Sequence, residues 1–261
     1  MPFHHSHALR YYTFASLEGH VPHAVFTRRG GVSPPPWDSL NLGGTVGDDP
    51  QRVAENKRRA LDVFGRRPES LFEVWQVHGC QVAIAHAPRP PQAPLPQADA
   101  ILTDRPEVTL LMRFADCVPI LLYDPRQRVI GLAHAGWQGT VRGVALAAVQ
   151  QMQAHYRSRP EDILAALGPS IGPDHYQVGQ DVVQALQQAL GKEQAEPFLF
   201  YRDNGIFLDL WAANRYWLER AGVHQIEVAA LCTACHTEDW YSHRAHRGRT
   251  GRFGVMIALE H

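Results

Sequence analysis

Three residues of metal-binding type lie near the ends of apolar segments in the middle of the chain. They are His78 in EVWQVHG, Cys117 in FADCVPILLYD and His134 in GLAHAGWQG. Two imidazole nitrogens and one thiolate are suitable zinc ligands, and three protein ligands leave the fourth tetrahedral position open to water. Zinc brings the pKa of such a water close to neutrality, which turns it into a nucleophile. These residue types are therefore compatible with a catalytic zinc site.

The long separations between these residues leave two alternatives open, because they match no short zinc motif. In the first, the histidines are hydrogen-bonded within the structure and the thiol packs as a small apolar side chain. In the second, Cys117 is a nucleophile and His78 or His134 is its base, since that chemistry needs the same residue types.

A second group of thiols lies near the C-terminus, where LCTACHTEDW contains Cys232, Cys235 and His236. C-x-x-C-H is the attachment motif of c-type haem, and C-x-x-C also occurs in redox sites. Haem attachment requires export, and the beginning of the chain has no secretory pattern. A thioredoxin-like motif opens a helix early in its fold, whereas this one follows a predicted late strand. We therefore expect structural thiols here.

Copper chemistry of the multicopper type requires several paired His-x-His motifs. The one such pair is His5-Ser6-His7, within residues 1–12, which we expect to be mobile. Copper is therefore disfavoured as a cofactor.

Candidate substrate contacts lie in glycine-rich and polar segments. Arginine in such a segment can bind phosphate or a sugar bidentately. Asn41 in SLNLGG is either a substrate contact or a turn residue, and GGTVG at 43–47 offers backbone amides to an anion. The candidate substrate-binding residues are Arg28, Asn41, Arg244 and Arg252.

The expected elements place these residues in an α/β (α+β) fold. Apolar runs at 108–114, 118–124, 129–135, 226–231 and 255–259 predict strands, the central ones covered on both faces. Helical periodicity predicts helices over 52–65, 139–156, 180–190 and 208–222, the first capped by Asp48 or Asp49. The loop at 27–50 is long enough to be functional, and the proline-rich segment 86–100 is expected to be a surface excursion.

Composition and charge limit the other possibilities. The 261 residues are 45% hydrophobic and carry a net charge of −1, which predicts a folded protein that binds neither nucleic acid nor membrane. Four cysteines and no secretory pattern favour the cytoplasm. Neither Lys57 nor Lys192 follows a phosphate-binding glycine loop. We expect a single domain over 1–261, with its core at about 22–258 and mixed sheets flanked by helices.

Seven segments in order resemble the laccase-domain family, long labelled polyphenol oxidase. They are FTRRGGVSPPPWDSLNLGGTVGDDP, WQVHG, ADCVPILLYD, AHAGWQGTVRGV, LGPSIGP, the late Cys-Thr and the final TGR. The resemblance covers about residues 22–258. It implies a His–Cys–His zinc site at His78, Cys117 and His134, on a single α/β domain with mixed sheets.

The resemblance also implies an activity. Members of the family are described as purine nucleoside phosphorylases with adenosine deaminase and methylthioadenosine phosphorylase activity, and a bacterial branch as a peptidoglycan editing factor. The implied partners are purine nucleosides and phosphate, with the protein a monomer or small homo-oligomer. Asp116 is the candidate acid for deamination, and Arg28, Arg244 or Arg252 the candidate phosphate ligand. The alternatives are an amidohydrolase that uses Cys117 on cell-wall precursors and, ranked third, a copper-dependent polyphenol oxidase.

Overall fold

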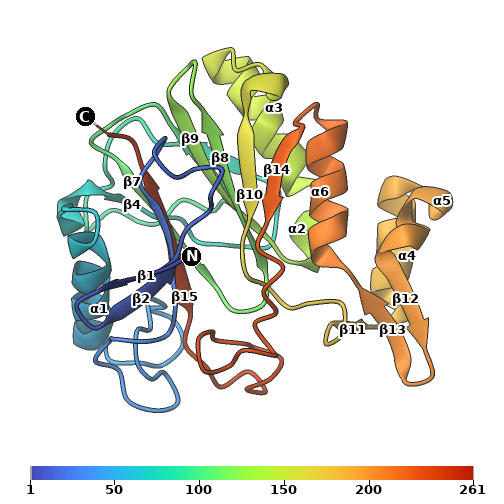
Figure 1. Ribbon diagram of the computed structural model, residues 1–261, viewed down its shortest axis with the longest axis horizontal. Helices are drawn as coiled ribbons and strands as arrows, with labels where there is room; N and C mark the ends of the chain where they lie inside the picture. The colour runs from blue at the N-terminus through green and yellow to red at the C-terminus, as the bar shows by residue number, and fades with distance from the viewer. Residues whose placement is uncertain (1, 261) are drawn as a thin grey trace.

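Two six-stranded sheets form the centre of the structure, a computed structural model that describes residues 2–260 (Figure 1). The first has the order β1 (Phe3–Ser6), β2 (Leu9–Tyr12), β3 (His23–Phe26), β15 (Phe253–Ala258), β7 (Thr109–Phe114) and β4 (Leu71–Phe72). The second has the order β14 (Gln225–Val228), β10 (Leu164–Leu167), β8 (Val118–Asp124), β9 (Val129–Ala135), β6 (Ala100–Thr103) and β5 (Val82–Ile84). Both are mixed, because the β4–β7, β5–β6 and β10–β14 pairs are parallel and the other pairs antiparallel.

Six α-helices and a small third sheet surround the two large sheets. The helices are α1 (Pro50–Asp62), α2 (Trp137–Val141), α3 (Val144–Tyr156), α4 (Gln180–Leu190), α5 (Lys192–Ala195) and α6 (Leu210–Arg220), with short 3-10 turns at Pro68–Ser70, Pro160–Asp162 and Glu196–Phe198. The third sheet has the order β11 (Gln177–Val178), β13 (Gly205–Leu208) and β12 (Leu199–Arg202). With α4 and α5 it projects from one side of the molecule, in orange in Figure 1. This architecture confirms the fold predicted from the sequence, a single α/β domain with mixed sheets and flanking helices.

Neighbouring side chains in a strand point to opposite faces of the sheet, and their contacts show what covers each face. In β8, Ile120 faces the helices α3, α4 and α6, whereas Leu121 faces the space between the two large sheets. In β15, Val255 lies between the sheets and Met256 packs toward α1. The layers are therefore α1, first sheet, second sheet and helices, which explains why the central strands are apolar on both faces.

Local sequence explains two helix boundaries. The side chain of Asp49 accepts a hydrogen bond from the backbone N–H of Gln51 and caps α1, with Pro50 in the first turn, as predicted. The expectation of a single helix over 139–156 is wrong in one respect, because two helices, α2 and α3, occupy this region. Gly143 has φ +71°, a left-handed conformation that ends α2 and begins α3.

The expectation that residues 1–12 are mobile is corrected for the part of this segment that the structure describes. Residues 3–12 form the hairpin β1–β2, and β2 pairs with β3. Phe3 packs edge-on against Tyr12 at 5.4 Å between ring centroids, and Arg10 forms an ion pair with Asp239 at 2.6 Å. These partners come from distant parts of the chain, so the segment is held by tertiary contacts rather than by local propensity.

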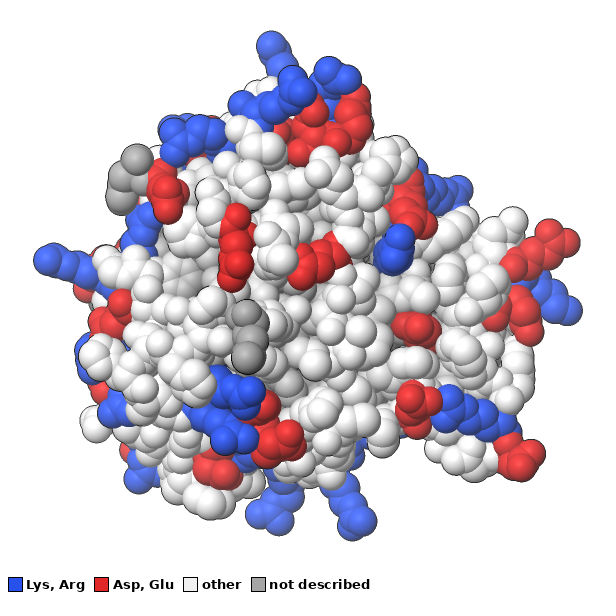
Figure 2. All heavy atoms as spheres, viewed as in Figure 1, with Lys and Arg blue, Asp and Glu red and all other residues white. Residues whose placement is uncertain are grey.

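Charged side chains of both signs are interspersed on the face of the molecule shown in Figure 2, with no broad field of one sign. Among residues 2–260, no helix is long and apolar enough to cross a membrane.

The stability of the fold should decrease as the pH is lowered, because His23 is buried in β3. Its Nε2 accepts a hydrogen bond from the backbone N–H of Phe14, and its Nδ1 donates to the carbonyl of Val21. Burial lowers the pKa of His23 from 6.5, although the Val21 carbonyl opposes this shift. Below about pH 6.5 the unfolded state therefore binds more protons than the native state. The free energy of unfolding should decrease by up to ~1.4 kcal/mol per pH unit, the limit for one linked proton.

Urea unfolding of the wild type and His23→Gln between pH 7.5 and 5 tests this expectation. Glutamine can accept from Phe14 but does not titrate, so the variant should lose less stability as the pH falls. His20→Gln, at an exposed position, is the control and should follow the wild type. Parallel pH curves for the wild type and His23→Gln would contradict the assignment.

Candidate metal centre

His78, Cys117 and His134 converge at the place where the two large sheets meet. The chain crosses from β7 in the first sheet to β8 in the second at residues 115–117, and this crossing carries Cys117. His134 is on β9, and His78 is on the loop between β4 and β5. One ligand atom from each residue lies within 4.8 Å of the others. His134 is buried, Cys117 half-buried and His78 exposed, so the cluster is open on one side.

Asp99, which sequence reasoning missed, orients two members of the cluster. This fully buried residue precedes β6, and its Oδ1 lies 2.8 Å from Nδ1 of His134. Its carboxylate also accepts from the backbone N–H groups of Val77, His78 and Gly79 at 3.1, 3.0 and 2.6 Å. The bond to Nδ1 leaves Nε2 of His134 for a metal, an arrangement common around metal-binding histidines.

The electrostatics of the cluster favour a thiolate beside an imidazolium. Burial alone would raise the pKa of Cys117, but His134 and then His78 outweigh burial and lower it to about 6. Burial would likewise lower the pKa of His134, but Cys117 and Asp99 raise it to about 9. Burial is also outweighed at Asp99, where hydrogen bonds from His134 and Gly79 lower the pKa. A cation would stabilise the thiolate directly and take the place of the imidazolium proton.

The donor set fits zinc. Two imidazoles and one thiolate suit this ion, and three ligands leave one position for water or substrate.

Gly136 allows the close approach of the ligands. A Cβ atom at this position would lie 2.8 Å from Sγ of Cys117 and 3.2 Å from Cδ2 of His78. We expect Gly136→Ala to fold but to bind metal about 10–100-fold more weakly, the range seen when the surroundings of metal ligands are disturbed. Competition with a chromophoric chelator measures this affinity. Gly44→Ala is the control, because a Cβ there would meet no atom within 4 Å. Equal affinities for the two variants would contradict this role.

A cavity of 720 Å³ opens beside the cluster. Its wall includes the three candidate ligands and Asp116. A second cavity, of 260 Å³, is lined by His78, Cys117 and Asp116 and also contacts Gly136 and Trp137. The candidate metal centre is therefore reached by two cavities.

Asp116 has a constrained position next to Cys117. Its φ of +87° lies in the left-handed region, which is uncommon for a residue other than glycine. Its Oδ1 accepts from the hydroxyl of Thr233 at 2.7 Å, and its Oδ2 accepts from the backbone N–H of Arg244 at 2.7 Å. These two bonds hold the carboxylate at the wall shared by both cavities.

Two of the four predicted substrate-binding residues lie in the wall of the larger cavity. Arg252 is half-buried, and its Nη1 donates to the carbonyls of Thr250 and Gly251. Burial lowers its pKa, and no ion pair within residues 2–260 involves it. Arg244 is exposed, donates to the carbonyl of Gln177, and lies over the ring of Tyr176 at 5.2 Å.

The structure does not bring Arg28 or Asn41 to this cavity. Arg28 forms an ion pair with Asp38 at 3.0 Å and donates to the carbonyl of Thr237, so its guanidinium joins two loops. Asn41 is fully buried, and its Oδ1 accepts from the backbone N–H groups of Gly43 and Arg252. Asn41 thus holds two cavity-lining segments in place.

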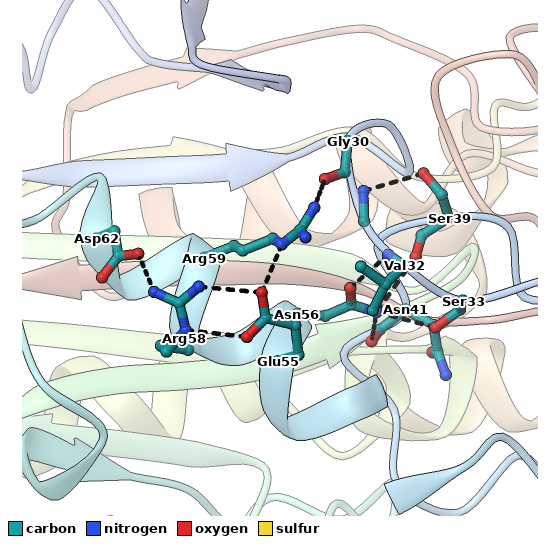
Figure 3. Close-up of polar contacts among 11 residues, drawn as sticks. Gly30, Val32, Ser33, Ser39, Asn41, Glu55, Asn56, Arg58, Arg59 and Asp62 are labelled. Atoms are coloured by element: carbon teal, nitrogen blue, oxygen red, sulfur yellow. Dashed lines mark hydrogen bonds and ion pairs between the residues drawn. The ribbon is translucent and has the colours of Figure 1, made fainter. Parts of the chain in front are cut away.

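The loop that carries these residues is fastened to α1 by Asn56 (Figure 3). The side chain of Asn56 donates to Oγ of Ser33 and to the carbonyls of Ser39 and Asn41. It also accepts from the backbone N–H of Val32. The glycine-rich loop therefore uses its polar groups for its own fold, and α1 acts as its support.

Several other cavity residues were missed in the sequence. Lys57 was considered only as a possible phosphate-loop lysine, yet it pairs with Glu73 at 2.7 Å and lines the cavity. Arg113 also pairs with Glu73, at 3.2 Å. Trp75 lines the cavity with 47% of its surface exposed. The indication available in the sequence was the tryptophan of EVWQVHG, which lies three residues before the candidate ligand His78.

A mixed α/β domain with a His–Cys–His cluster between two large sheets defines the class of this protein. The family model described as multi-copper polyphenol oxidoreductase laccase matches residues 22–260, and the chain belongs to that family. It is 42% identical, over 92% of its length and 89% of the relative's, to a protein of Deinococcus radiodurans named purine nucleoside phosphorylase. It is 36% identical to purine nucleoside phosphorylase YfiH of Escherichia coli, over 89% of this chain and 91% of the relative.

Solved structures of the family have the same fold. The crystal structure of YlmD from Geobacillus stearothermophilus matches with a TM-score of 0.92 and 34% identity, covering 100% of this chain and 99% of that one. The crystal structure of the Bacillus licheniformis hypothetical protein YfiH matches with a TM-score of 0.91 and 33% identity, covering 99% of both chains.

Proposed function

We propose that this chain is a zinc-dependent purine nucleoside enzyme. It would phosphorolyse adenosine, inosine, guanosine and methylthioadenosine to the free base and a ribose 1-phosphate, and deaminate adenosine to inosine. The observation that carries the proposal is the convergence of His78, Cys117 and His134 on a 720 Å³ cavity. The names of the relatives supply the substrate class. Bound zinc would supply a water of lowered pKa and a Lewis acid at the cavity wall.

The cavity wall offers groups for both substrates of phosphorolysis. Arg252 and Arg244 present guanidinium groups suited to bidentate phosphate binding. Lys57 and Arg113 are already paired with Glu73, so they are weaker candidates. In the reaction a phosphate oxygen attacks C1′ of the ribose, and the bond from C1′ to the purine breaks. These arginines would hold the phosphate for that attack.

The purine itself needs an aromatic or apolar surface. Trp75 lines the larger cavity with 47% of its surface exposed, and stacking on an aromatic ring is favourable for a purine. In deamination, water adds to C6 and ammonia leaves. Asp116 lies at the wall of both cavities, fixed by Thr233 and Arg244, and would carry the proton to the departing ammonia.

Chromatography of the products tests the proposal. Zinc-loaded protein is incubated with adenosine, with and without phosphate. Inosine should form in both samples, whereas adenine, hypoxanthine and ribose 1-phosphate should form only with phosphate. Unchanged adenosine in both samples would overturn the proposal. Oxidation of a phenol that requires added copper, without nucleoside turnover, would instead support the oxidase alternative.

One observation favours a second candidate function. The lowered pKa of Cys117, about 6, is that of a thiol activated by neighbouring histidines. Cys117 would then attack an amide such as the muramoyl–amino acid bond of a cell-wall precursor, in a cytoplasmic editing reaction. A chelator would leave this activity intact, and an alkylating agent would abolish it and modify Cys117. Loss of amidase activity on zinc removal would exclude the thiol mechanism.

A further inference from the structure

A second cluster of potential metal ligands lies outside the candidate centre. It consists of His175, on the loop between β10 and β11, and Cys232 and Cys235, which follow β14. One ligand atom from each lies within 4.8 Å of the others. Nδ1 of His175 is 3.7 Å from Sγ of Cys232 and 3.5 Å from Sγ of Cys235. Both cysteines are free thiols.

These distances are those of ligands on one tetrahedral ion. Zinc binds sulfur at about 2.3 Å and imidazole nitrogen at about 2.0–2.1 Å, so tetrahedral geometry places nitrogen and sulfur about 3.6 Å apart. The two measured separations bracket this value. Two thiolates and a neutral imidazole would also neutralise the charge of a divalent zinc ion.

The backbone presents the three side chains to one another. Ser170 forms a parallel bridge with Cys232, and the N–H of Thr233 donates to the carbonyl of Ser170 at 2.9 Å. The N–H of His175 donates to the carbonyl of Gly172 in a turn, while the N–H of Gly172 donates to Sγ of Cys232 at 3.2 Å. These backbone contacts hold Cys232 and His175 next to each other.

Core packing does not account for the cluster. His175 and Cys235 are exposed and Cys232 is half-buried, so the three are not small side chains filling an interior.

We propose that His175, Cys232 and Cys235 form a second zinc site, separate from the His78–Cys117–His134 cluster. The fourth position is left to water, because the nearest further candidates are engaged elsewhere. Asp174 pairs with Arg202 at 2.5 Å, and His236 pairs with Glu238 at 3.4 Å. The two cysteines alone resemble a haem or redox motif in the sequence, and it is His175 that makes them a metal site.

The site would fasten two segments of the cavity wall. Thr233, beside Cys232, donates to Asp116, and Tyr176, beside His175, lines both cavities. An ion held by residues 175, 232 and 235 would tie these segments together. The second site is independent of the reaction proposed for the first, since its evidence is the ligand geometry alone.

Metal stoichiometry tests the proposal on the full-length chain. Reduced, metal-free protein is loaded with Zn²⁺, freed of excess ion by gel filtration and measured for zinc per chain. The wild type should hold two ions and Cys235→Ser one. His134→Ala, which removes a ligand of the first cluster, should also hold one. Cys80→Ser is the matched control, because Cys80 is a free half-buried thiol of neither cluster, and it should hold two.

Substitution with Co²⁺ identifies the ligands. In His134→Ala, bound Co²⁺ should show strong thiolate-to-cobalt absorption, and adding Cys235→Ser should weaken it by about half or more, since one of two thiolates is lost. His175→Gln is a second route to the same loss if Cys235→Ser folds poorly. One zinc per wild-type chain would overturn the proposal. So would two zinc ions retained by both Cys235→Ser and His175→Gln.

Discussion

Replacing His134 with alanine is expected to remove zinc from the first cluster and to abolish phosphorolysis and deamination together. His134 is buried, and Asp99 holds its Nδ1, so Nε2 is the ligand atom that the substitution removes. Two ligands, one of them on the exposed side, do not make a tight zinc site. We expect both rates to fall by about three orders of magnitude or more, because deamination loses its activated water and phosphorolysis loses the Lewis acid at the cavity wall.

Zinc per chain, product chromatography and circular dichroism measure this outcome on one preparation. His20→Ala, at an exposed turn position, is the control and should keep full zinc content and activity. A folded His134→Ala that retains activity without zinc in the first cluster would show that the metal mechanism is wrong. Loss of only one of the two activities would show that they use different groups.

The candidate ligands could be predicted from the sequence because histidine and cysteine are themselves metal-binding residue types. His78, Cys117 and His134 interrupt or end apolar runs, where a polar side chain needs a reason, and the ordered family segments single out the same three residues. The strands that position them were equally accessible, since runs such as 118–124 and 129–135 are too apolar for a half-exposed sheet. The same runs did not reveal that a second sheet, rather than helices alone, covers one face.

The parts that the sequence did not reveal depend on register and on distant partners. Asp99 meets His134 because β6 and β9 pair with Ala100 opposite Ala133, and no local pattern specifies that register. The hairpin at 3–12 is held by Trp240 and Asp239, more than two hundred residues away along the chain. Arg28 and Asn41 were expected to contact substrate, but their polar atoms bind Asp38 and Gly43 within the loop and Thr237 and Arg252 outside it.

Asp99→Asn should damage both the metal centre and the fold, although it changes only one atom of the side chain. The Asp99 carboxylate has four partners, three backbone N–H groups and the ring nitrogen of His134, two on each oxygen. An asparagine side chain offers one oxygen and one NH₂ group, so one pair of donors must face another donor. In a fully buried position each such mismatch is costly, and we expect a loss of about 2–4 kcal/mol in the free energy of unfolding.

The same substitution should weaken zinc binding about 10–100-fold, the usual effect of losing the partner of a metal-binding histidine. The control is Asp203→Asn, which makes the same chemical change at an exposed position between β12 and β13 and should leave both quantities unchanged. Urea unfolding of the metal-free protein separates the effect on the fold from the effect on the ion, because only the fold contributes there. If Asp99→Asn kept the zinc affinity of the wild type while losing stability, Asp99 would be a support for residues 77–79 and not the residue that orients His134.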